Sequence, residues 1–306
     1  MKIRVLLATI SVFLILSSVL MMSGCRNDNT DAKSIVVTYS ILGSVVKELI
    51  GDEATVTVLI PDGVDPHDWE PSARDIEKIN QASLVVRNGL NLEEGLEATL
   101  ASAESHGVKL FTATDYLTVR HVGLGEGIPS DDPDQQIGAA DPHFWVDPMA
   151  MKSVVSALAA ELKATMGINI DVRAADLESR LDSLNGEITA MVAEISTANR
   201  KLVTGHESMG YFADRYGFQL IGAVIPNLST QAEVSAADIA ALINLIKANP
   251  VKAIFAESGT SAAVVQTVAN ATGVQIVELV THRLTVDGSY LTFMSNLAGT
   301  ITNALK

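Results

Sequence analysis

The sequence predicts an α/β protein with two Rossmann-like lobes, each built on a parallel sheet, joined by one long bridging helix. The first observation behind this prediction is that apolar runs of strand length alternate with helical patterns in both halves of the chain, as in parallel βαβ units. The second is a single longer helical pattern that separates the two halves. The third is length, because residues 34–306 are enough for two domains with a core each.

In the first half, strands and helices are expected to alternate. The strands are expected at residues 35–39, 55–60, 84–87 and 108–111, and the helices at residues 42–50, 72–81 and 92–104. Ser72 is a favourable N-cap for the second of these helices, with Asp75 in its first turn. Residues 118–142 then hold glycines, prolines and acids and predict an exposed loop, and a helix follows from Pro148 to about Met166.

A long amphipathic helix is expected over residues 171–197. Apolar residues recur there at spacings of 4, 3, 4, 3 and 4, at Leu177, Leu181, Leu184, Ile188, Met191 and Ile195, which places them on one helix face. A helix of about 25 residues is roughly 40 Å long, enough to run along two lobes. The alternative is a free coiled coil, which the pattern disfavours because it covers fewer than four heptads.

After this helix the alternation resumes. Strands are expected at residues 201–204, 219–224, 251–256 and 274–279, and helices at residues 236–247, 261–271 and 289–305. We therefore expect an N-terminal lobe at 34–167, the bridging helix at 168–199 and a C-terminal lobe at 200–306.

The amino terminus has the layout of a secretory signal peptide. Lys2 and Arg4 precede an almost wholly apolar run at 5–20, and small residues then lead to Cys25. The segment resembles a bacterial lipoprotein signal, in which the cysteine after the cleavage site receives lipid, palmitate included. We expect a signal peptide at 1–24, a lipidated polar tether at 25–33, and a protein held on the extracytoplasmic face of the cell membrane. The alternative is a plain transmembrane anchor, for which the apolar run is near the short limit.

Cysteine count and charge exclude several classes of protein. Cys25 is the only cysteine, so the exported chain has no internal disulfide. The formal net charge is −15, and removing residues 1–24, which contain two cations and no acid, makes it −17. Such a chain has nothing to neutralise phosphates, so nucleic acid is not expected as a partner. The charge is compatible with gathering cations.

Two of the histidines lie in a repeated motif. The chain has six histidines, His67, His106, His121, His143, His206 and His282. His67 lies in DPHDW and His143 lies in DPHFW, and these segments hold the only two tryptophans. The proline fixes φ and keeps the preceding chain extended, which helps to present an imidazole from a loop.

Two further histidines follow expected strands, His206 in VTGHES and His282 in ELVTHRL. All four are thus expected at strand carboxyl ends, where ligands bind in open α/β sheets, and imidazole is a good zinc ligand. Any one of them alone is better explained as a packing or loop histidine, and His106 and His121 fit that interpretation. Nearby carboxylates are candidates to orient the rings, namely Asp65, Asp68, Glu70, Asp141, Asp147 and Glu207.

Over essentially the whole mature chain, the sequence resembles the metal-binding solute receptors of bacterial ABC importers, the zinc and manganese cluster A-I. The motifs that carry the resemblance are PDGVDPHDWEPSARDI (61–76), NGLNLE (88–93), ADPHFWVDP (140–148), KLVTGHESMGYFADRYGF (201–218), IFAE (254–257) and VTHRL with DGSYLTFM (280–294). The resemblance implies two α/β lobes bridged by one helix, with the metal between them. It implies His67, His143 and His206 as ligands.

The fourth ligand in this family is usually an acid, at the position that aligns with His282. This chain departs from the family there, and Glu278 is the alternative ligand. Zinc-type relatives often carry a histidine-rich loop between the first two ligands, whereas 118–142 is short and acidic with only His121. A metal-collecting role for this loop is therefore not expected.

The resemblance implies a high-affinity receptor that delivers a divalent ion to an ABC permease and its ATPase, and we expect a monomer without enzymatic activity. Four imidazoles favour Zn²⁺ over Mn²⁺, which prefers oxygen ligands, and predict that affinity falls as the pH drops through about 6.5. The alternatives are a manganese receptor of the same family, an adhesin or metal store, and an exported zinc hydrolase. The hydrolase is disfavoured because the chain has neither HExxH nor GxSxG.

Overall fold

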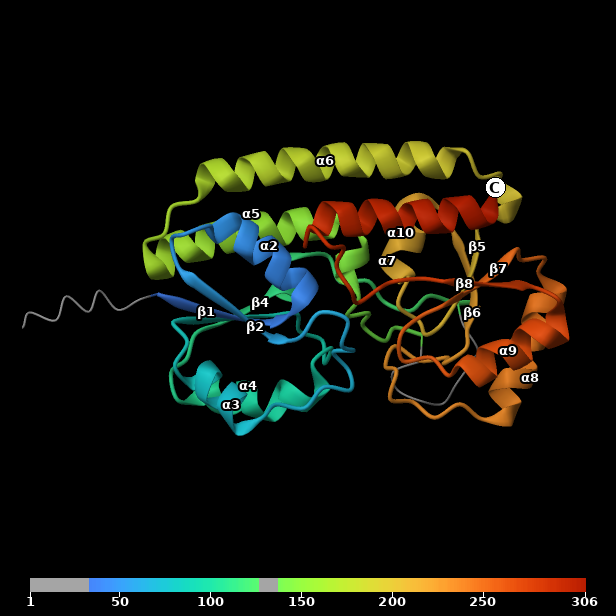
Figure 1. Ribbon diagram of the computed structural model, residues 1–306, viewed down its shortest axis with the longest axis horizontal. Helices are drawn as coiled ribbons and strands as arrows, with labels where there is room; N and C mark the ends of the chain where they lie inside the picture. Colours follow the sequence, from blue (N-terminus) through green and yellow to red (C-terminus); the bar gives the residue numbers. More distant parts are fainter. Residues whose placement is uncertain (1–32, 127–136) are drawn as a thin grey trace, which may run out of the picture. The chain divides into compact units, whose positions relative to one another are not determined.

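The computed structural model describes residues 33–126 and 137–306 (Figure 1). The expected signal peptide at 1–24, Cys25 with all of the tether but its last residue, and residues 127–136 of the expected loop lie outside the described residues. Within the described part of the chain, no helix is both long enough and apolar enough to span a bilayer.

The N-terminal lobe is built on a four-stranded parallel sheet in the order β2-β1-β3-β4. Its strands are β1 (Ser34–Tyr39), β2 (Thr55–Ile60), β3 (Leu84–Arg87) and β4 (Leu110–Thr112). The central strand β1 is almost wholly apolar and buried, because helices cover both faces of a parallel sheet. All four strands were predicted, although β4 begins two residues later than expected.

The helices of this lobe also follow the predicted order, as α2 (Ser40–Ile50), α3 (Ala73–Asn80) and α4 (Glu97–Ser105). The predicted cap of α3 is confirmed, because the Ser72 hydroxyl accepts from the Asp75 N–H while the Asp75 carboxylate accepts from the Ser72 N–H. The third helix begins differently from the prediction. Its first turn is a 3₁₀ helix, η1 (Glu94–Leu96), and the α-helix starts only at Glu97.

Beyond β4 the chain forms a short 3₁₀ turn, η2 (Ala113–Tyr116), and then the expected loop, whose described ends pair through an antiparallel bridge between His121 and Ala140. A further 3₁₀ turn, η4 (Phe144–Val146), leads into α5 (Pro148–Met166), whose predicted bounds are confirmed. The Asp147 carboxylate caps α5 by accepting from the Met149 N–H at 2.8 Å.

The bridging helix is α6 (Asp171–Ala193). It ends four residues before the predicted end, and a 3₁₀ turn, η5 (Thr197–Asn199), follows it. Ile195, the last residue of the apolar pattern, is buried although it lies beyond the helix. In Figure 1, α6 runs along both lobes and packs on α5 and α10 (Tyr290–Leu305).

The C-terminal lobe contains two parallel strand pairs. The first pair is β5 (Lys201–Thr204) with β6 (Gln219–Ala223), and the second is β7 (Ala253–Ala256) with β8 (Gln275–Glu278). The pairs lie next to each other through β5 and β7. The other helices are α7 (Gly210–Tyr216), α8 (Ala236–Ala248) and α9 (Ala262–Thr272). These elements confirm the α/β class with two lobes, and the exact domain boundaries 34–167, 168–199 and 200–306 remain a prediction.

A fully buried tryptophan connects elements of the two lobes. Trp145, in η4, donates its indole N–H to the Thr281 carbonyl at 3.1 Å, and its own carbonyl accepts from the Tyr290 hydroxyl at 2.8 Å. Because both partners belong to the C-terminal part of the chain, the segment that carries His143 is fixed against the loop that carries His282.

Candidate metal centre

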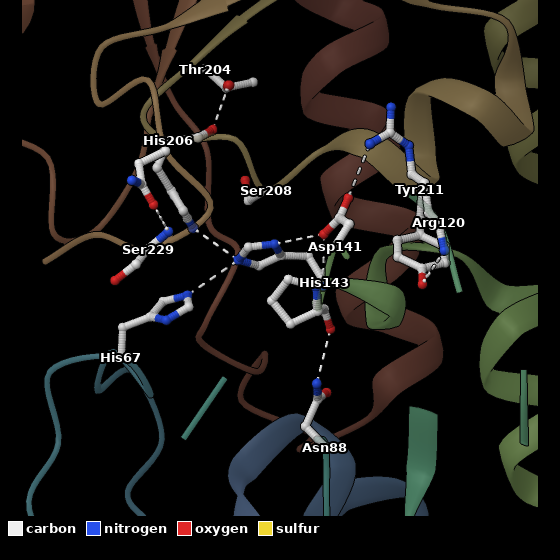
Figure 2. Close-up of polar contacts among 12 residues, drawn as sticks. His67, Asn88, Arg120, Asp141, His143, Thr204, His206, Ser208, Tyr211 and Ser229 are labelled. Carbon is white, nitrogen blue, oxygen red and sulfur yellow. Dashed lines mark hydrogen bonds and ion pairs between the residues drawn. The ribbon is translucent and has the colours of Figure 1, made fainter. Parts of the chain in front are cut away.

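Three imidazoles meet where the two lobes face each other (Figure 2). The Nε2 atom of His143 lies 3.3 Å from Nε2 of His67 and 3.2 Å from Nε2 of His206. One nitrogen of each of the three rings lies within 4.8 Å of the others, and all three residues are buried. Four ligands at about 2.0–2.1 Å from a tetrahedral zinc ion lie about 3.3–3.4 Å from one another. The two Nε2 distances from His143 therefore match the spacing between ligands of a tetrahedral zinc ion.

The two DPH motifs form the same local structure. Asp65 Oδ1 accepts from the backbone N–H of His67 at 3.0 Å, and Asp141 Oδ1 accepts from that of His143 at 2.9 Å. An aspartate that bonds the backbone two residues ahead forms a turn, and the intervening proline fixes φ. The two copies of the DPH motif therefore form the same turn, and this turn directs the imidazole of each copy toward that of the other.

Asp141 also orients the ring of His143. The Nδ1 atom of His143 lies 2.9 Å from Asp141 Oδ1, and Asp141 Oδ2 accepts from Arg120 Nη1 at 3.4 Å. A carboxylate acceptor requires the proton to be on Nδ1, which leaves the Nε2 lone pair free to bind an ion. Burial raises the pKa of Asp141 to about 6, although the charge of Arg120 partly offsets this effect.

The ring of His67 is oriented by a residue that the sequence did not indicate as part of the site. Its Nδ1 atom lies 3.2 Å from Oε1 of Glu94, in the 3₁₀ turn η1. The hydrogen bond with His67 is the main reason that the pKa of Glu94 is lowered, and a hydrogen bond from Ser229 contributes as well. Glu94 directly follows the NGLNLE motif, and this position next to a recognised segment is the only sequence signal that marks it.

His206 follows β5 by two residues and lies against a second unpredicted acid, Glu257. Glu257 Oε1 accepts from the Gly205 N–H at 2.9 Å, and its Oε2 accepts from the Ser208 hydroxyl at 2.7 Å. His206 Nδ1 lies 3.5 Å from Glu257 Oε2, but no hydrogen bond forms between them. Burial raises the pKa of Glu257 to about 7, and the hydrogen bonds from Ser208 and Thr281 partly offset this effect. Glu257 is the last residue of the IFAE motif, which was its one sequence signal.

His282 lies beside this trio of histidines. Its ring is roughly parallel to that of His206, at 25° and a centroid separation of 5.9 Å, and it packs on Trp145 at 5.6 Å. Its Nδ1 atom lies 3.3 Å from the Thr281 hydroxyl, while its Nε2 atom is buried without a hydrogen-bond partner among the described residues. Glu278, the alternative ligand, is exposed at the end of β8. Both residues line an open cavity of about 560 Å³ that also reaches Glu257.

Burial sets the protonation of these rings. It lowers the pKa of His143 and of His206 well below the usual 6.5, and the neighbouring imidazoles lower it further. It lowers the pKa of His282 to about 4. At neutral pH these three imidazoles are therefore neutral, which is the form that binds metal.

The expectation that all four histidines follow strands is wrong for His143. Among the described residues directly before His143, the only strand-like feature is the isolated bridge at Ala140. The 3₁₀ turn η4 begins directly after His143. The hydrogen bonds of the DPH turn, and not a strand end, fix its position. The remaining histidines, His106 and His121, are exposed, as expected for residues outside the site.

The flanking carboxylates have different roles. Asp147 caps α5 and forms an ion pair with Arg215 at 2.7 Å, so it acts in folding. Glu207 lines a small cavity together with Arg120 and Glu126, and burial raises its pKa to about 7. Asp65 and Asp68 contact the C-terminal lobe, whereas the exposed Glu70 has no polar contact with any of the four histidines in the described structure.

The comparisons with known proteins identify the family of the chain. The family model described as "Zinc-uptake complex component A periplasmic" (ZnuA) matches residues 35–304. The chain belongs to this family. ZnuA-family proteins are substrate-binding receptors of metal ABC transporters, so the class of protein inferred from the sequence is confirmed.

Relatives of this ZnuA-family chain include the manganese-binding lipoprotein MntA of Halalkalibacterium halodurans, 26% identical over 96% of this chain and 97% of that protein. The iron ABC transporter substrate-binding lipoprotein MtsA of Streptococcus pyogenes serotype M1 is 27% identical over 88% of this chain and 85% of that protein. Among solved structures, the periplasmic zinc binding protein TroA of Treponema pallidum matches with a TM-score of 0.76 at 25% identity. This match covers 89% of the present chain and 99% of TroA.

Proposed function

We propose that this ZnuA-family chain captures one zinc ion outside the cytoplasm and delivers it to an ABC permease and its ATPase. The observation that carries the proposal is the Nε2 spacing of 3.3 Å and 3.2 Å around His143, which matches the edge of a tetrahedral zinc site. We propose His67, His143 and His206 as three of the ligands. We further propose that the protein acts as a monomer and catalyses no reaction.

His282 is proposed as the fourth ligand. The support is its buried Nε2 atom, which has no hydrogen-bond partner in the described part of the chain, because a buried polar atom without a partner is costly unless a ligand satisfies it. The ring lies next to that of His206, so a small movement of the loop after β8 brings it to the ion. Glu278 is less suited because it is exposed at the end of that strand.

The proposed ion is zinc because the donor set is nitrogen. Relatives of the chain are named for manganese, iron and zinc, so the family alone does not select the metal. Manganese prefers carboxylate, carbonyl and water oxygens, whereas imidazole suits zinc. The nearest carboxylates support the same choice, since Asp141 and Glu94 contact the Nδ1 atoms of ligand rings and are thereby engaged in orienting them.

We also propose that the chain is exported by a signal peptide at 1–24 and lipidated at Cys25, with 25–33 as a tether to the membrane. The lipoprotein-like start of the sequence supports this, and several relatives are named lipoproteins. Mass spectrometry of the membrane fraction is expected to find a lipid-modified peptide that begins at Cys25. A Cys25→Ser variant recovered in the same membrane-bound amount contradicts the anchor.

The experiment that tests the transport proposal uses a deletion strain in zinc-depleted medium. We expect slow growth and reduced zinc uptake, with recovery when the chain is restored. The matched control is the chain with His143→Ala, which is expected to give no recovery. Normal zinc uptake in the deletion strain contradicts import and favours an adhesin or a metal store.

A further inference from the structure

A three-residue segment of the C-terminal lobe contacts three acids of the N-terminal lobe. The segment 229–231, here called the strap, lies in the loop between β6 and α8. Each strap side chain donates one hydrogen bond to a different carboxylate, from Ser229 Oγ to Glu94 Oε1 at 2.5 Å, from Thr230 Oγ1 to Asp65 Oδ2 at 2.7 Å, and from Gln231 Nε2 to Asp68 Oδ1 at 2.8 Å. The three donors are consecutive residues, and their three acceptors all lie around His67.

The acceptors are the groups that hold His67. Glu94 Oε1, which accepts from the strap, is the same atom that lies 3.2 Å from His67 Nδ1. Asp65 accepts from the backbone N–H of His67 through its other oxygen. Asp68 directly follows His67 in the sequence. The strap therefore reaches His67 through its carboxylate partners, and within residues 33–126 and 137–306 it makes no polar contact with the imidazole itself.

The strap is itself held in shape by local contacts. The Ser229 N–H donates to Asn227 Oδ1 at 2.8 Å, and the Gln231 N–H donates to the Ser229 hydroxyl at 3.2 Å. Gly259, with φ of +85°, lies against the contact between Thr230 and Asp65. A Cβ atom at this glycine would lie 2.8 Å from Asp65 Oδ2, so the close approach of the lobes at this point depends on glycine.

We propose that the strap positions His67 for metal binding and thereby sets the rate at which the bound ion leaves. The proposal rests on the proposed function, since it assumes that His67 is a ligand. Hydrogen bonds to charged carboxylates are stronger than neutral ones, and the partners of ligand histidines typically change metal affinity about 10–100-fold. Because the three bonds join the two lobes, they break when the lobes separate at this edge, and His67 then loses the group that orients its ring.

The first test removes one hydroxyl from the strap. Ser229→Ala is expected to raise the zinc dissociation rate about tenfold, whereas Ser229→Thr, which keeps the hydroxyl, is expected to restore most of the original rate. The matched control is Ser261→Ala, since Ser261 is exposed in the same lobe and its side chain makes no capping hydrogen bond. Dissociation is measured by stopped-flow transfer of zinc to an excess of a chromogenic chelator.

The second test uses the exposed end of the strap, where a substitution does not disturb the core. Gln231→Glu places a carboxylate against Asp68 and is expected to raise the dissociation rate by repulsion. Adding Asp68→Asn exchanges the amide and the carboxylate, restores the hydrogen bond, and is expected to return the rate toward the original value. Gln219→Glu, at an exposed position of the same lobe, is the charge-matched control.

Zinc stoichiometry at equilibrium and the melting temperature are measured on every variant, because they separate the two proposals. If the unmodified chain binds no zinc, the proposed function fails. If it binds one ion but Gln231→Glu and Ser229→Ala release zinc at the original rate, the strap proposal alone is wrong. The strap proposal is also contradicted if zinc dissociates faster from Gln231→Glu and adding Asp68→Asn does not lower the rate again. The exchanged pair restores a positioning contact, but it does not repair a general disturbance of the structure.

Discussion

The two halves of the candidate metal centre differ in how their histidines are held. In the N-terminal lobe, Nδ1 of His67 and Nδ1 of His143 each contact a carboxylate, at 3.2 Å and 2.9 Å. In the C-terminal lobe, Nδ1 of His206 and Nε2 of His282 have no hydrogen-bond partner among residues 33–126 and 137–306. One half is thus oriented by its own hydrogen bonds, and the other still has buried nitrogens to satisfy.

This difference suggests a division of labour in metal capture. Rings fixed by carboxylates are already aimed and lose little freedom when an ion binds, whereas no carboxylate accepts a hydrogen bond from the described rings of His206 and His282, so these rings are ordered more by the ion itself. The strap fits this arrangement, because it adds contacts from the C-terminal lobe to the acids around His67. We therefore expect changes to the N-terminal half to cost more affinity than equivalent changes to the C-terminal half.

The largest effect is expected from His143→Ala. Its Nε2 atom is the one that lies close to both other nitrogens, at 3.3 Å and 3.2 Å. Loss of a hydrogen-bond partner of a ligand lowers metal affinity by roughly 100-fold at most. Removing the His143 imidazole removes a ligand itself, so it should lower zinc affinity by more than this. Competition against a chelator of known affinity measures this. An affinity within tenfold of the original shows that the ion binds elsewhere.

His282→Ala should have the next largest effect, about 10–100-fold, because the trio can still hold the ion with water in the fourth position. The preference for zinc over manganese should narrow at the same time, since the lost donor is a nitrogen. Parallel titrations with both metals check this. Glu278→Ala is the matched comparison, and a greater loss there than in His282→Ala transfers the fourth position to Glu278.

The third prediction compares the acids of the two halves. Asp141→Asn should lower zinc affinity about 10–100-fold, because Asp141 fixes the proton on His143 Nδ1. Glu257→Gln should cost less, since its carboxylate makes no hydrogen bond to the His206 ring. The same competition titration measures both. Equal losses in the two variants contradict the difference between the halves.

The smallest effect concerns pH. Burial raises the pKa of Asp141 to about 6 and that of Glu257 to about 7, while a bound dication favours their charged forms. Zinc binding must then release protons below these values, so affinity should be constant above pH 7 and fall below it. The slope is at most about tenfold per pH unit for each group. The neutral form of His282 persists down to about pH 4 and adds a decline only there.

From the sequence alone, we expected zinc affinity to fall through about pH 6.5 because the histidines become protonated. Burial lowers the pKa of His143, His206 and His282, so for these rings the fall is assigned to the carboxylates instead. Titrations from pH 8 to pH 5 on the Asp141→Asn, Glu257→Gln double variant separate the two explanations. The decline should be clearly smaller in this variant. A decline of unchanged size means that imidazole protonation controls the affinity.

Sequence patterns predicted the fold well because strand and helix periods are local properties. The bounds of β2, β3, α5 and β5 are the predicted ones. The errors occur where packing replaces the local pattern. The bridging helix ends at Ala193 although its apolar pattern continues to Ile195.

The histidines of the site were predicted because motifs mark them, whereas their partners were not, because nothing local connects them. Glu94 lies 27 residues from His67, and Glu257 lies 51 residues from His206. The strap is more distant still, with Ser229 135 residues from Glu94. Only the folded chain brings these groups together, so their functions follow from contacts and not from spacing.

The measurement that tests the central claim most directly is a pair of calorimetric titrations of the metal-stripped protein, with zinc and with manganese. The proposed imidazole site predicts one ion per chain and tighter binding of zinc. It also predicts that the zinc signal is lost in His143→Ala. Tighter binding of manganese, or zinc binding that survives His143→Ala, would contradict a zinc site built on His67, His143 and His206.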